Sequence, residues 1–252
     1  SIPAPRGLIY DRNYEVIAEN KPKFQLEMIP EQVNQLENSL LYLADLGILN
    51  RDEIKIIEER VRRNYQFKSI VIKRNLDDRE IAILANNRML LKGYDIKSRL
   101  TRNYPQNEIY AHVVGYMGSI SNSDYERFNP SFYTGKEQIG KSAIEREYEH
   151  ILRGTPGMQK LLVNVRGRVM DQVEKDAFAT GNDIMLTLNS ELQKTAYESM
   201  SGRKGSVVAL DPRNGEILAM ISVPSFDPTA ISLGLSQAEF DKLNSNTKRP
   251  LF

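Results

Sequence analysis

The stretch RGLIYDRN, residues 6–13, stands near the start of the chain and carries three charged side chains, Arg6, Asp11 and Arg12. Prolines lie on both sides of it, and each proline disfavours helix at itself and at the residue before it. We therefore expect short strands and turns over residues 1–27. An Arg–Asp pair beside a turn most often forms a local ion pair, so a local bridge is our first interpretation of these charges, and contact with a partner is the alternative.

The composition of the 252 residues, 40% hydrophobic and 27% charged, is that of an ordinary globular chain and excludes disordered, collagen-like and disulfide-stapled proteins. Thirty-four Lys and Arg residues against 33 Asp and Glu residues give a formal net charge of +1, so the overall charge offers no argument for a nucleic acid partner. The longest apolar stretch, Leu40 to Leu49, contains Asp45 and is shorter than the ~18 residues that span a bilayer. The length predicts one or two domains.

Chemistry that depends on Cys or His has few candidates in this chain. No Cys is present, which excludes a thiol nucleophile, thiolate zinc ligands and disulfides. Two His residues, His112 and His150, are available for a metal centre or a Ser-His-Asp triad. We therefore predict no catalytic, cofactor-binding or metal-binding residue.

Helical spacing of apolar residues predicts three helices in the first hundred residues: one from Glu31 to Gly47, one after Asn50, and one after Asp77 that ends at Gly93 in a left-handed cap. Asn50 and Asp77 are each followed three residues later by Glu, which is the spacing of a capping box. Further helices are expected over 139–152 and from Asn189 or Ser190 to about Met200. The expected strands are 67–72, 94–104 and 159–173.

The clearest local prediction is a β-hairpin formed by residues 206–211 and 216–223. The connecting segment, Pro212-Arg213-Asn214-Gly215, contains Asn-Gly, which supplies the positive φ angles that tight hairpin turns need. Large apolar side chains occupy both faces of the hairpin. We expect residues 183–252 to self-associate or to be more mobile than the rest, because a two-stranded unit with open edges is marginal in water.

RGLIYDRN with Ile17-Ala18 resembles the signature R-G-x-I-x-D-R-N-G-x-x-L-A at the start of the periplasmic part of class B penicillin-binding proteins. The pattern is most similar to the cell-elongation member of that family, and the resemblance covers essentially the whole chain. Further segments that resemble family motifs follow in the expected order: 100–105, 111–116, 139–149, 166–168, 183–193, 211–220 and 224–228.

Three residues depart from the family pattern at turns, and one of them, Asn214, replaces the common Thr before Gly215. Tyr14 and Ala143 stand where the family usually has Gly. We expect the turns at both positions to avoid positive φ, because a side chain makes that conformation costly.

The resemblance implies an α+β fold in which residues 1–177 form a non-catalytic, dimerisation-type pedestal. Its strand-rich base would comprise 1–29 and 105–177, with a small α/β head inserted at about 30–104. Residues 178–252 would be the first helix and β-hairpin of a β-lactamase-like transpeptidase domain. The residues expected to shape the pedestal are Arg6, Gly7, Asp11, Arg12, Gly140, Lys141, Glu145, Arg166 and Gly167.

In such enzymes a Ser-x-x-Lys serine attacks the stem peptide, with Ser-x-Asn and Lys-Thr-Gly elements beside it. Neither of the latter two elements occurs here, and Ser-x-x-Lys occurs at Ser201 and Ser245, close to the roughly one match that chance predicts. The resemblance therefore implies a full-length peptidoglycan D,D-transpeptidase whose first part, this chain, is inactive. The alternative is a soluble β-lactamase-like serine hydrolase that uses Ser201 or Ser245.

The resemblance also implies the partners and the location. The full-length enzyme would be anchored by a single membrane pass on the periplasmic side of the bacterial inner membrane, with the anchor outside this chain. Its partners would be a SEDS-family glycan polymerase and a rod-shape scaffold protein. The peptidoglycan stem peptide and β-lactams would bind only the full-length enzyme, and no cofactor or nucleic acid is implied.

Two local charge patterns have simple interpretations. Lys141 and Glu145 are spaced to pair on a solvated helix face. Residues 51–74 contain eight Lys or Arg and four Asp or Glu residues, and within them Arg62 and Arg63 are our partner-binding candidates. A solvated helix face is the simplest explanation of this segment, and lipid head groups or an acidic partner are the alternatives.

Overall fold

The computed structural model describes residues 4–121, 123–127, 138–163, 169–235, 237–247 and 250–251. The fold is α+β, as the resemblance implied. The chain divides into two compact units. Unit 1 comprises residues 1–21, 101–159 and 175–252, and unit 2 comprises residues 22–100 and 160–174. The division into a pedestal (1–177), its head (30–104) and a transpeptidase fragment (178–252) stays a prediction. None of the described helices is long and apolar enough to cross a bilayer.

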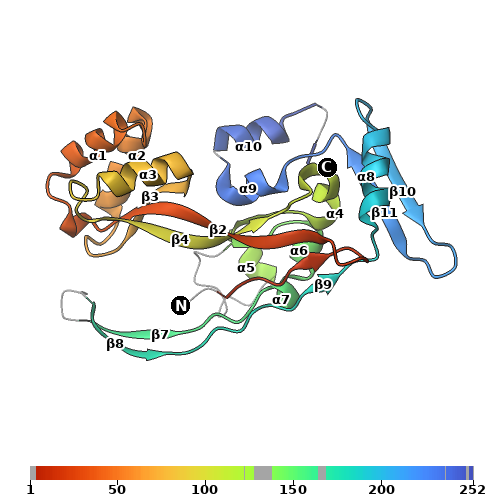
Figure 1. The fold of residues 1–252 in the computed structure, drawn as a ribbon, viewed down its shortest axis with the longest axis horizontal. Coiled ribbons are helices and arrows are strands. Elements are labelled where there is room, and N and C mark those ends of the chain that lie inside the picture. Colours follow the sequence, from red (N-terminus) through yellow and green to blue (C-terminus); the bar gives the residue numbers. More distant parts are fainter. Residues whose placement is uncertain are drawn as a thin grey trace. The chain divides into compact units, whose positions relative to one another are not determined.

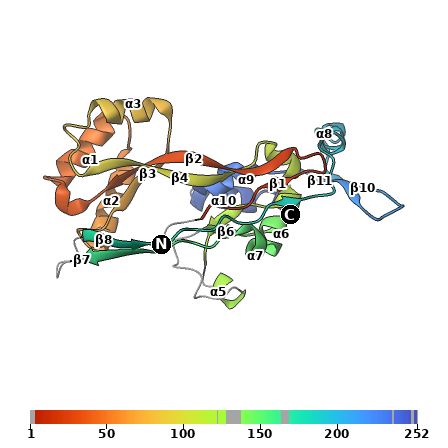
Figure 2. The ribbon, with the colours of Figure 1, turned by 60° about the horizontal axis from the view of Figure 1, so that its bottom comes forward.

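Unit 2 contains the C-terminal part of a long strand, β2 (Val16–Met28). This strand pairs antiparallel with β3 (Ile70–Leu76) and also pairs with β4 (Tyr94–Asn103). Helices α1 (Leu36–Asp45), α2 (Arg51–Arg63) and α3 (Asp78–Asn86) gather around these strands (Figures 1 and 2). Their apolar faces share one core, and each such side chain contributes about 1.5–3 kcal/mol on burial. The core includes Leu26, Met28, Leu40, Leu43, Ile57, Ile72 and Leu84.

The capping boxes predicted for α2 and α3 are present. Asn50 Oδ1 accepts from the Glu53 N–H at 2.9 Å, while Glu53 Oε2 accepts from the Asn50 N–H at 2.7 Å. Asp77 and Glu80 repeat this reciprocal arrangement at 2.7 and 3.0 Å. These contacts satisfy backbone donors that a helix start leaves without partners.

Two predicted helix ends in unit 2 were wrong. The first helix begins at Leu36 rather than Glu31, because residues 30–32 form a separate 3-10 turn and Gln35 takes a φ of +58°. The third helix ends at Asn86, well before Gly93. Gly93 has a φ of +87° in the turn that precedes β4, where its carbonyl accepts the Ile29 N–H at 2.9 Å.

The sheet strands of unit 1 include the first part of β2. Here β1 (Ile9–Tyr10) is antiparallel to β2 and parallel to β9 (Ile184–Met185). Its core includes Ile9, Ile17, Tyr104, Tyr110, Val114, Leu152 and Leu188. The other described elements of unit 1 before residue 159 are η2 (Asn107–Tyr110), α4 (Ala111–Val114), β5 (Met117–Ser119), α5 (Asp124–Arg127), β6 (Gln138–Gly140), α6 (Ala143–Glu147) and α7 (Glu149–Leu152). The strands β7 (Gln159–Val163) and β8 (Val169–Lys175) belong almost entirely to unit 2.

Two longer predicted elements are each divided in the structure. The expected helix 139–152 consists of β6, α6 and α7, because its first residues pair with β5. The expected strand 159–173 is a pair of strands, β7 and β8, that form their own two-stranded sheet.

The C-terminal part contains α8 (Ser190–Ser199), β10 (Gly205–Leu210), β11 (Ile217–Val223), α9 (Pro228–Gly234) and α10 (Gln237–Asn244). Asn189 caps α8 by accepting the Leu192 N–H at 3.0 Å, and the predicted hairpin β10–β11 is present. Figure 1 shows α8 lying alongside β11.

The turn of this hairpin differs from the prediction. Within the Asn-Gly pair, Gly215 alone takes a positive φ, of +78°. The connecting loop is longer than a two-residue turn, because the Gly215 N–H donates to the Asp211 carbonyl at 2.8 Å and the register shifts at Leu210. A residue in the left-handed region followed by a bulge is the usual geometry of such longer loops.

The prediction that Tyr14 and Ala143 avoid positive φ was wrong, since their φ angles are +64° and +47°. The Asp11 carboxylate fixes the turn at Tyr14 by accepting the N–H groups on both sides of it, those of Asn13 and Glu15. Ala143 is the first residue of α6, and only Lys141 and Ser142 separate it from β6. The backbone itself therefore requires the left-handed conformation at both positions, and both side chains are strained there.

Candidate functional site

A buried cluster of four charged side chains lies in unit 1. The guanidinium of Arg6 contacts Glu145 Oε2 through Nε at 2.6 Å and Glu149 Oε2 through Nη1 at 2.7 Å. Arg102 at the end of β4 contacts the other oxygen of Glu145 through Nε at 2.7 Å. All four side chains are at most 9% exposed. Two cations and two anions thus balance one another, which is the condition for burying charge.

Neutral groups add hydrogen bonds to this cluster, although Arg102 Nη2 is buried without a hydrogen-bond partner among the described residues. Arg102 Nη1 donates to the Gly7 carbonyl at 2.7 Å, and Arg6 Nη2 donates to the Glu145 carbonyl at 2.8 Å. Burial alone would raise the pKa of Glu145, but the charges of Arg6 and Arg102 hold it below its ordinary value. The carboxylate therefore remains ionised at neutral pH.

Gly7 and Gly140 allow the backbones around the cluster to approach each other. A Cβ atom on Gly7 would lie 1.9 Å from the Asn182 carbonyl oxygen, and one on Gly140 would lie 2.0 Å from that of Glu145. The Gly140 N–H also donates to Glu149 Oε2 at 3.0 Å. The structure thus brings Arg6, Gly7, Gly140 and Glu145, four of the residues that the sequence analysis singled out, into one place.

The interpretation of Lys141 and Glu145 as a solvated helix pair was wrong. Glu145 is fully buried, and the Lys141 ammonium contacts Asp124 at 2.5 Å instead. Because α6 starts only at Ala143, Lys141 precedes the helix and does not share a face with Glu145.

The local bridge expected among Arg6, Asp11 and Arg12 was also wrong, because all three reach distant segments. Asp11 Oδ2 accepts from the Ser190 N–H at 3.1 Å and from its hydroxyl at 2.8 Å. The Tyr110 hydroxyl donates a hydrogen bond to Ser190 Oγ at 2.8 Å, so Tyr110, Ser190 and Asp11 are linked in series. Burial would raise the pKa of Asp11, but the N–H of Glu15 and the Ser190 groups lower it, so an anion sits at the start of α8.

Two further contacts join the RGLIYDRN stretch to the C-terminal part of unit 1. Arg12 Nη2 lies 2.9 Å from Glu216 Oε2 in the hairpin loop, with both side chains about one-third exposed. The Leu8 N–H donates to Asp183 Oδ1 at 2.7 Å. One short segment therefore contacts both the Glu145 region and residues 183–216.

In the described ranges, no catalytic arrangement surrounds the remaining candidates. Ser201 and Ser245 are exposed residues just beyond α8 and α10. His112 packs edge-on to Phe226, its Nε2 lies 3.0 Å from the Pro250 carbonyl, and burial lowers its pKa. Arg166 and Gly167 lie outside the described residues. No group of three metal-ligating side chains occurs among the residues that the structure describes.

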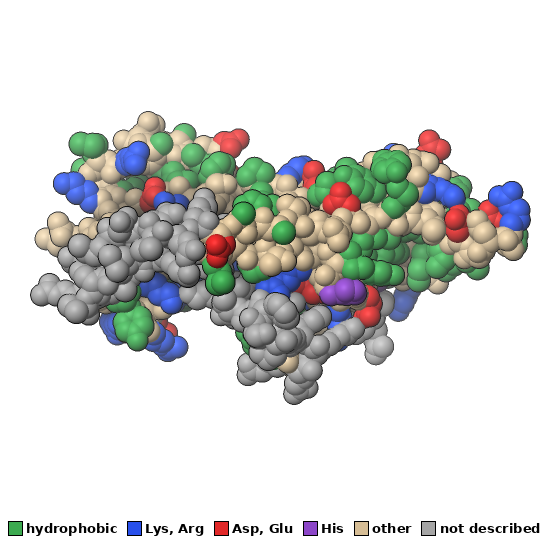
Figure 3. All heavy atoms as spheres, turned by 90° about the horizontal axis from the view of Figure 1, so that it is seen from below, with side chains coloured by type: hydrophobic (Ala, Val, Ile, Leu, Met, Phe, Trp, Pro, Cys, Tyr) green, Lys and Arg blue, Asp and Glu red, His purple; other side chains and the backbone are tan. Residues whose placement is uncertain are grey.

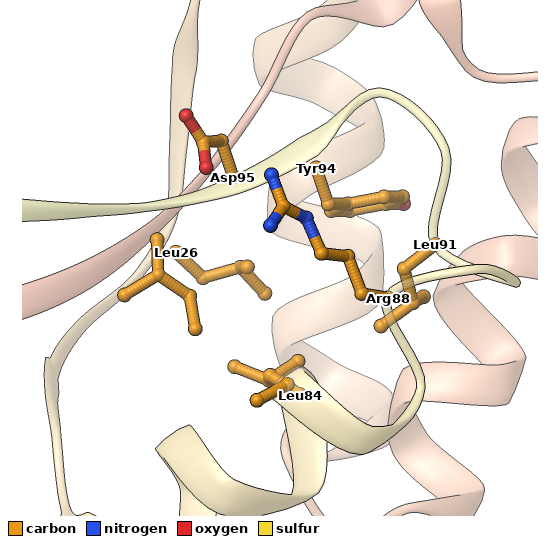
Figure 4. Close-up of a pocket in the computed structure, with 8 residues that line it drawn as sticks. Leu26, Leu84, Arg88, Leu91, Tyr94 and Asp95 are labelled. Atoms are coloured by element: carbon orange, nitrogen blue, oxygen red, sulfur yellow. The ribbon is translucent and has the colours of Figure 1, made fainter.

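Unit 2 contains a hollow of about 230 Å³ that the sequence analysis missed (Figure 4). Leu26 and Leu84 line its apolar part, while Arg88 and Asp95 supply one charge of each sign. The remaining lining residues are Ala85, Leu91, Tyr94 and Ile96. Met89 and Leu90, in the turn beside it, are 84% and 70% exposed. The three consecutive apolar residues Met89-Leu90-Leu91 could have indicated an exposed apolar surface here, because such residues beyond the end of a helix cannot all face the protein core.

Arg62 and Arg63 lie at the C-terminal end of α2 and are exposed. On the face shown in Figure 3, the described Lys and Arg side chains are interspersed with Asp and Glu. This mixture agrees with the net charge of +1. Any charge-driven contact must therefore be local.

Comparison with known proteins gives consistent matches. The family model for the penicillin-binding protein dimerisation domain matches residues 1–186. Peptidoglycan D,D-transpeptidase MrdA of Escherichia coli K12 is 36% identical over 250 residues, which are 98% of this chain and 40% of that protein. MrdA of Acinetobacter baumannii is 32% identical over 251 residues, 100% of this chain and 37% of that protein. The chain thus spans about two-fifths of the length of these relatives.

Two solved structures of penicillin-binding proteins also match this chain. The complex between penicillin-binding protein 2 (PBP2) and MreC from Helicobacter pylori matches with a TM-score of 0.77 and 26% identity, covering 100% of this chain and 47% of that one. A second structure, of PBP2 from the same organism, matches with a TM-score of 0.70 and 25% identity, covering 100% of this chain and 48% of that one.

Proposed function

The chain belongs to the penicillin-binding protein dimerisation-domain family, and from that premise we propose that it is the non-catalytic pedestal of a peptidoglycan D,D-transpeptidase that cross-links stem peptides during cell elongation. The relatives that match it end to end carry the transpeptidase name. The activity would belong to the whole protein, whose membrane anchor would hold it on the periplasmic side of the inner membrane.

The observation that carries this proposal is the use made of the RGLIYDRN side chains. Arg6 pairs with Glu145 in the buried cluster, and Asp11 accepts from Ser190 at the start of α8. Arg12 pairs with Glu216 in the hairpin loop. These residues hold segments of unit 1 together. A pedestal that supports a following domain fits this arrangement.

The catalytic part of the proposal is tested with fluorescent penicillin. The full-length enzyme should form a covalent adduct, and the 252-residue chain should form none. An adduct on Ser201 or Ser245, located by mass spectrometry, would favour the serine hydrolase alternative and overturn the pedestal assignment.

The second part of the proposal concerns partners. We propose that unit 2 docks a rod-shape scaffold protein and that the full-length protein also works with a SEDS-family glycan polymerase. Of the two H. pylori PBP2 structures described above, the one with the higher TM-score is a complex with MreC. The hollow beside Leu84 and the exposed Met89 and Leu90 supply an apolar surface of the kind that anchors a partner side chain.

A double variant tests this docking surface. Met89→Ser with Leu90→Ser should weaken binding of the scaffold's periplasmic domain at least about tenfold, because both side chains are exposed before binding and would be buried by it. Met158→Ser is the matched control, since Met158 is 62% exposed in unit 1. Unchanged calorimetric affinity in the double variant would remove this surface from the proposal.

A further inference from the structure

The end of α2 and the loop after it form a strongly basic surface of unit 2. Residues 60–74 contain six Lys or Arg and no Asp or Glu. Lys73 is withdrawn from this surface, because its ammonium contacts Glu80 and the Ile48 carbonyl, both at 2.6 Å. Arg60, Arg62, Arg63 and Lys68 remain exposed around the loop, and Arg74 is exposed farther along, on β3.

Within the part of the chain that the structure describes, carboxylates neutralise little of this charge. Glu59 lies 3.6 Å from Arg63, but the two side chains are 67% and 80% exposed, so water and salt screen the pair. Glu27, which borders the loop, is engaged by the Ser69 hydroxyl at 2.6 Å and by the Gln25 amide. The cations are thus available to an external anion.

Aromatic rings stand among these cations. Tyr65 and Phe67 stack on each other with ring centroids 5.5 Å apart and an interplanar angle of 20°, yet they are 71% and 37% exposed. Ile56, one helical turn before Arg60 on the outer face of α2, is 51% exposed. We call these three residues together with Arg60, Arg62, Arg63 and Lys68 the basic–aromatic patch.

The loop that carries the rings is held in place by its backbone. The Lys68 N–H donates to the Tyr65 carbonyl at 3.0 Å, and the Glu31 N–H donates to the Gln66 carbonyl at 2.9 Å. The rings are therefore presented outward before any partner arrives, and binding would cost little further ordering of the backbone.

We propose that the basic–aromatic patch binds an anionic phospholipid surface. A membrane interface accepts both features at once, since Lys and Arg pair with phosphate head groups while Tyr and other apolar side chains enter the boundary between head groups and acyl chains. The patch residues do not line the hollow of unit 2. This inference goes beyond the proposed docking of a protein and can fail without affecting it.

Vesicle co-sedimentation tests the proposal with the 252-residue chain. The chain should bind vesicles of phosphatidylglycerol mixed with phosphatidylcholine more tightly than vesicles of phosphatidylcholine alone, and added salt should weaken the binding. Arg62→Ser with Arg63→Ser should lower the affinity about tenfold or more. Tyr65→Ser with Phe67→Ser should remove most of the binding that survives in salt, because that part comes from apolar contact.

The control is Arg203→Ser with Lys204→Ser, which removes two adjacent exposed cations of unit 1. It should leave the affinity unchanged, and circular dichroism should show every variant folded. Equal loss in this control would overturn the proposal, and so would equal binding to both kinds of vesicle. If the chain instead binds polyglutamate through Arg62 and Arg63 and ignores the vesicles, the partner is an acidic protein and the lipid proposal is wrong.

Discussion

Arg6 and Glu145 lie 139 positions apart in the sequence and form a buried ion pair of 2.6 Å. Arg102 closes on the other oxygen of the same carboxylate. Three segments of unit 1 therefore meet at one side chain. Removing one member of such a cluster leaves an opposite charge buried without its partner, which costs more than the pair itself contributes.

This relationship gives a prediction for stability. Glu145→Gln should destabilise the chain by about 3–5 kcal/mol, because Arg6 and Arg102 would be left buried without a carboxylate. Urea unfolding of the 252-residue chain measures the change. Glu216→Gln, which breaks the exposed pair with Arg12, should cost only about 0–1 kcal/mol. Similar losses in the two variants would contradict the assignment of Glu145 as the centre of the cluster.

A second prediction concerns acid. The pKa values of Glu145 and Asp11 are lower in the folded chain than their ordinary values. The unfolded state therefore binds more protons between the two pKa values of each group, and stability falls as the pH falls through that range. We expect stability to be level above about pH 5 and to decline below it.

The acid prediction is checked by unfolding the chain in urea at a series of pH values. Asp11→Asn should lower stability at pH 7 and flatten the decline below pH 5, because one carboxylate with a lowered pKa is then absent. If the slope of stability against pH is the same with and without Asp11, its contacts with Ser190 do not favour the ionised form.

A third prediction uses the two strained positions. Tyr14→Gly and Ala143→Gly should each stabilise the chain by up to about 1 kcal/mol, since a non-glycine residue in the left-handed region costs ~1–2 kcal/mol and the added freedom of Gly when unfolded offsets part of that. Thermal unfolding measures the effect. Ala196→Gly in the middle of α8 is the control and should destabilise by roughly 1 kcal/mol. Destabilisation at Tyr14 and Ala143 as well would show that the side chains, not the backbone, decide these turns.

The sequence predicted features that depend on near neighbours. The capping boxes at Asn50 and Asp77 follow from chemistry three residues apart, and the hairpin follows from two apolar runs around Asn-Gly. The left-handed conformation of Gln35 places the start of α1 at Leu36, and no sequence pattern near Gln35 predicts that conformation. Local spacing therefore predicted the caps and the strand pairing, but not the positive φ angles at Tyr14 and Gln35.

Long-range partners could not be predicted in the same way. The motif order marked Arg6 and Glu145 as important, but spacing along the chain cannot show that they meet. A charged residue such as Glu145 is expected to be exposed, and its burial is possible here because Arg6 and Arg102 pair with its carboxylate. The hollow beside Leu84 was missed for a related reason, because α3 and β4 build it together.

The last prediction concerns the open side of the β10–β11 hairpin. On the inner side, α8 covers β11, and the Gln193 side chain bonds both the N–H and the carbonyl of Met220, at 2.8 and 2.7 Å. On the outer face, Val208 and Leu210 remain 51% and 59% exposed, and no described strand pairs with the far edge of β10.

An open edge beside exposed apolar side chains favours pairing with another strand. We therefore expect the 252-residue chain to self-associate through residues 205–223, and sedimentation should show a dimer at high concentration. Val208→Lys with Leu210→Lys should shift it to monomer, because charge on an edge strand opposes pairing, while Lys92→Ser on unit 2 should leave the dimer unchanged. Hydrogen exchange provides the second measurement: the β10 amides should gain protection with concentration. A strictly monomeric chain whose β10 amides exchange as slowly as those of β2 would mean that the edge is covered within one molecule.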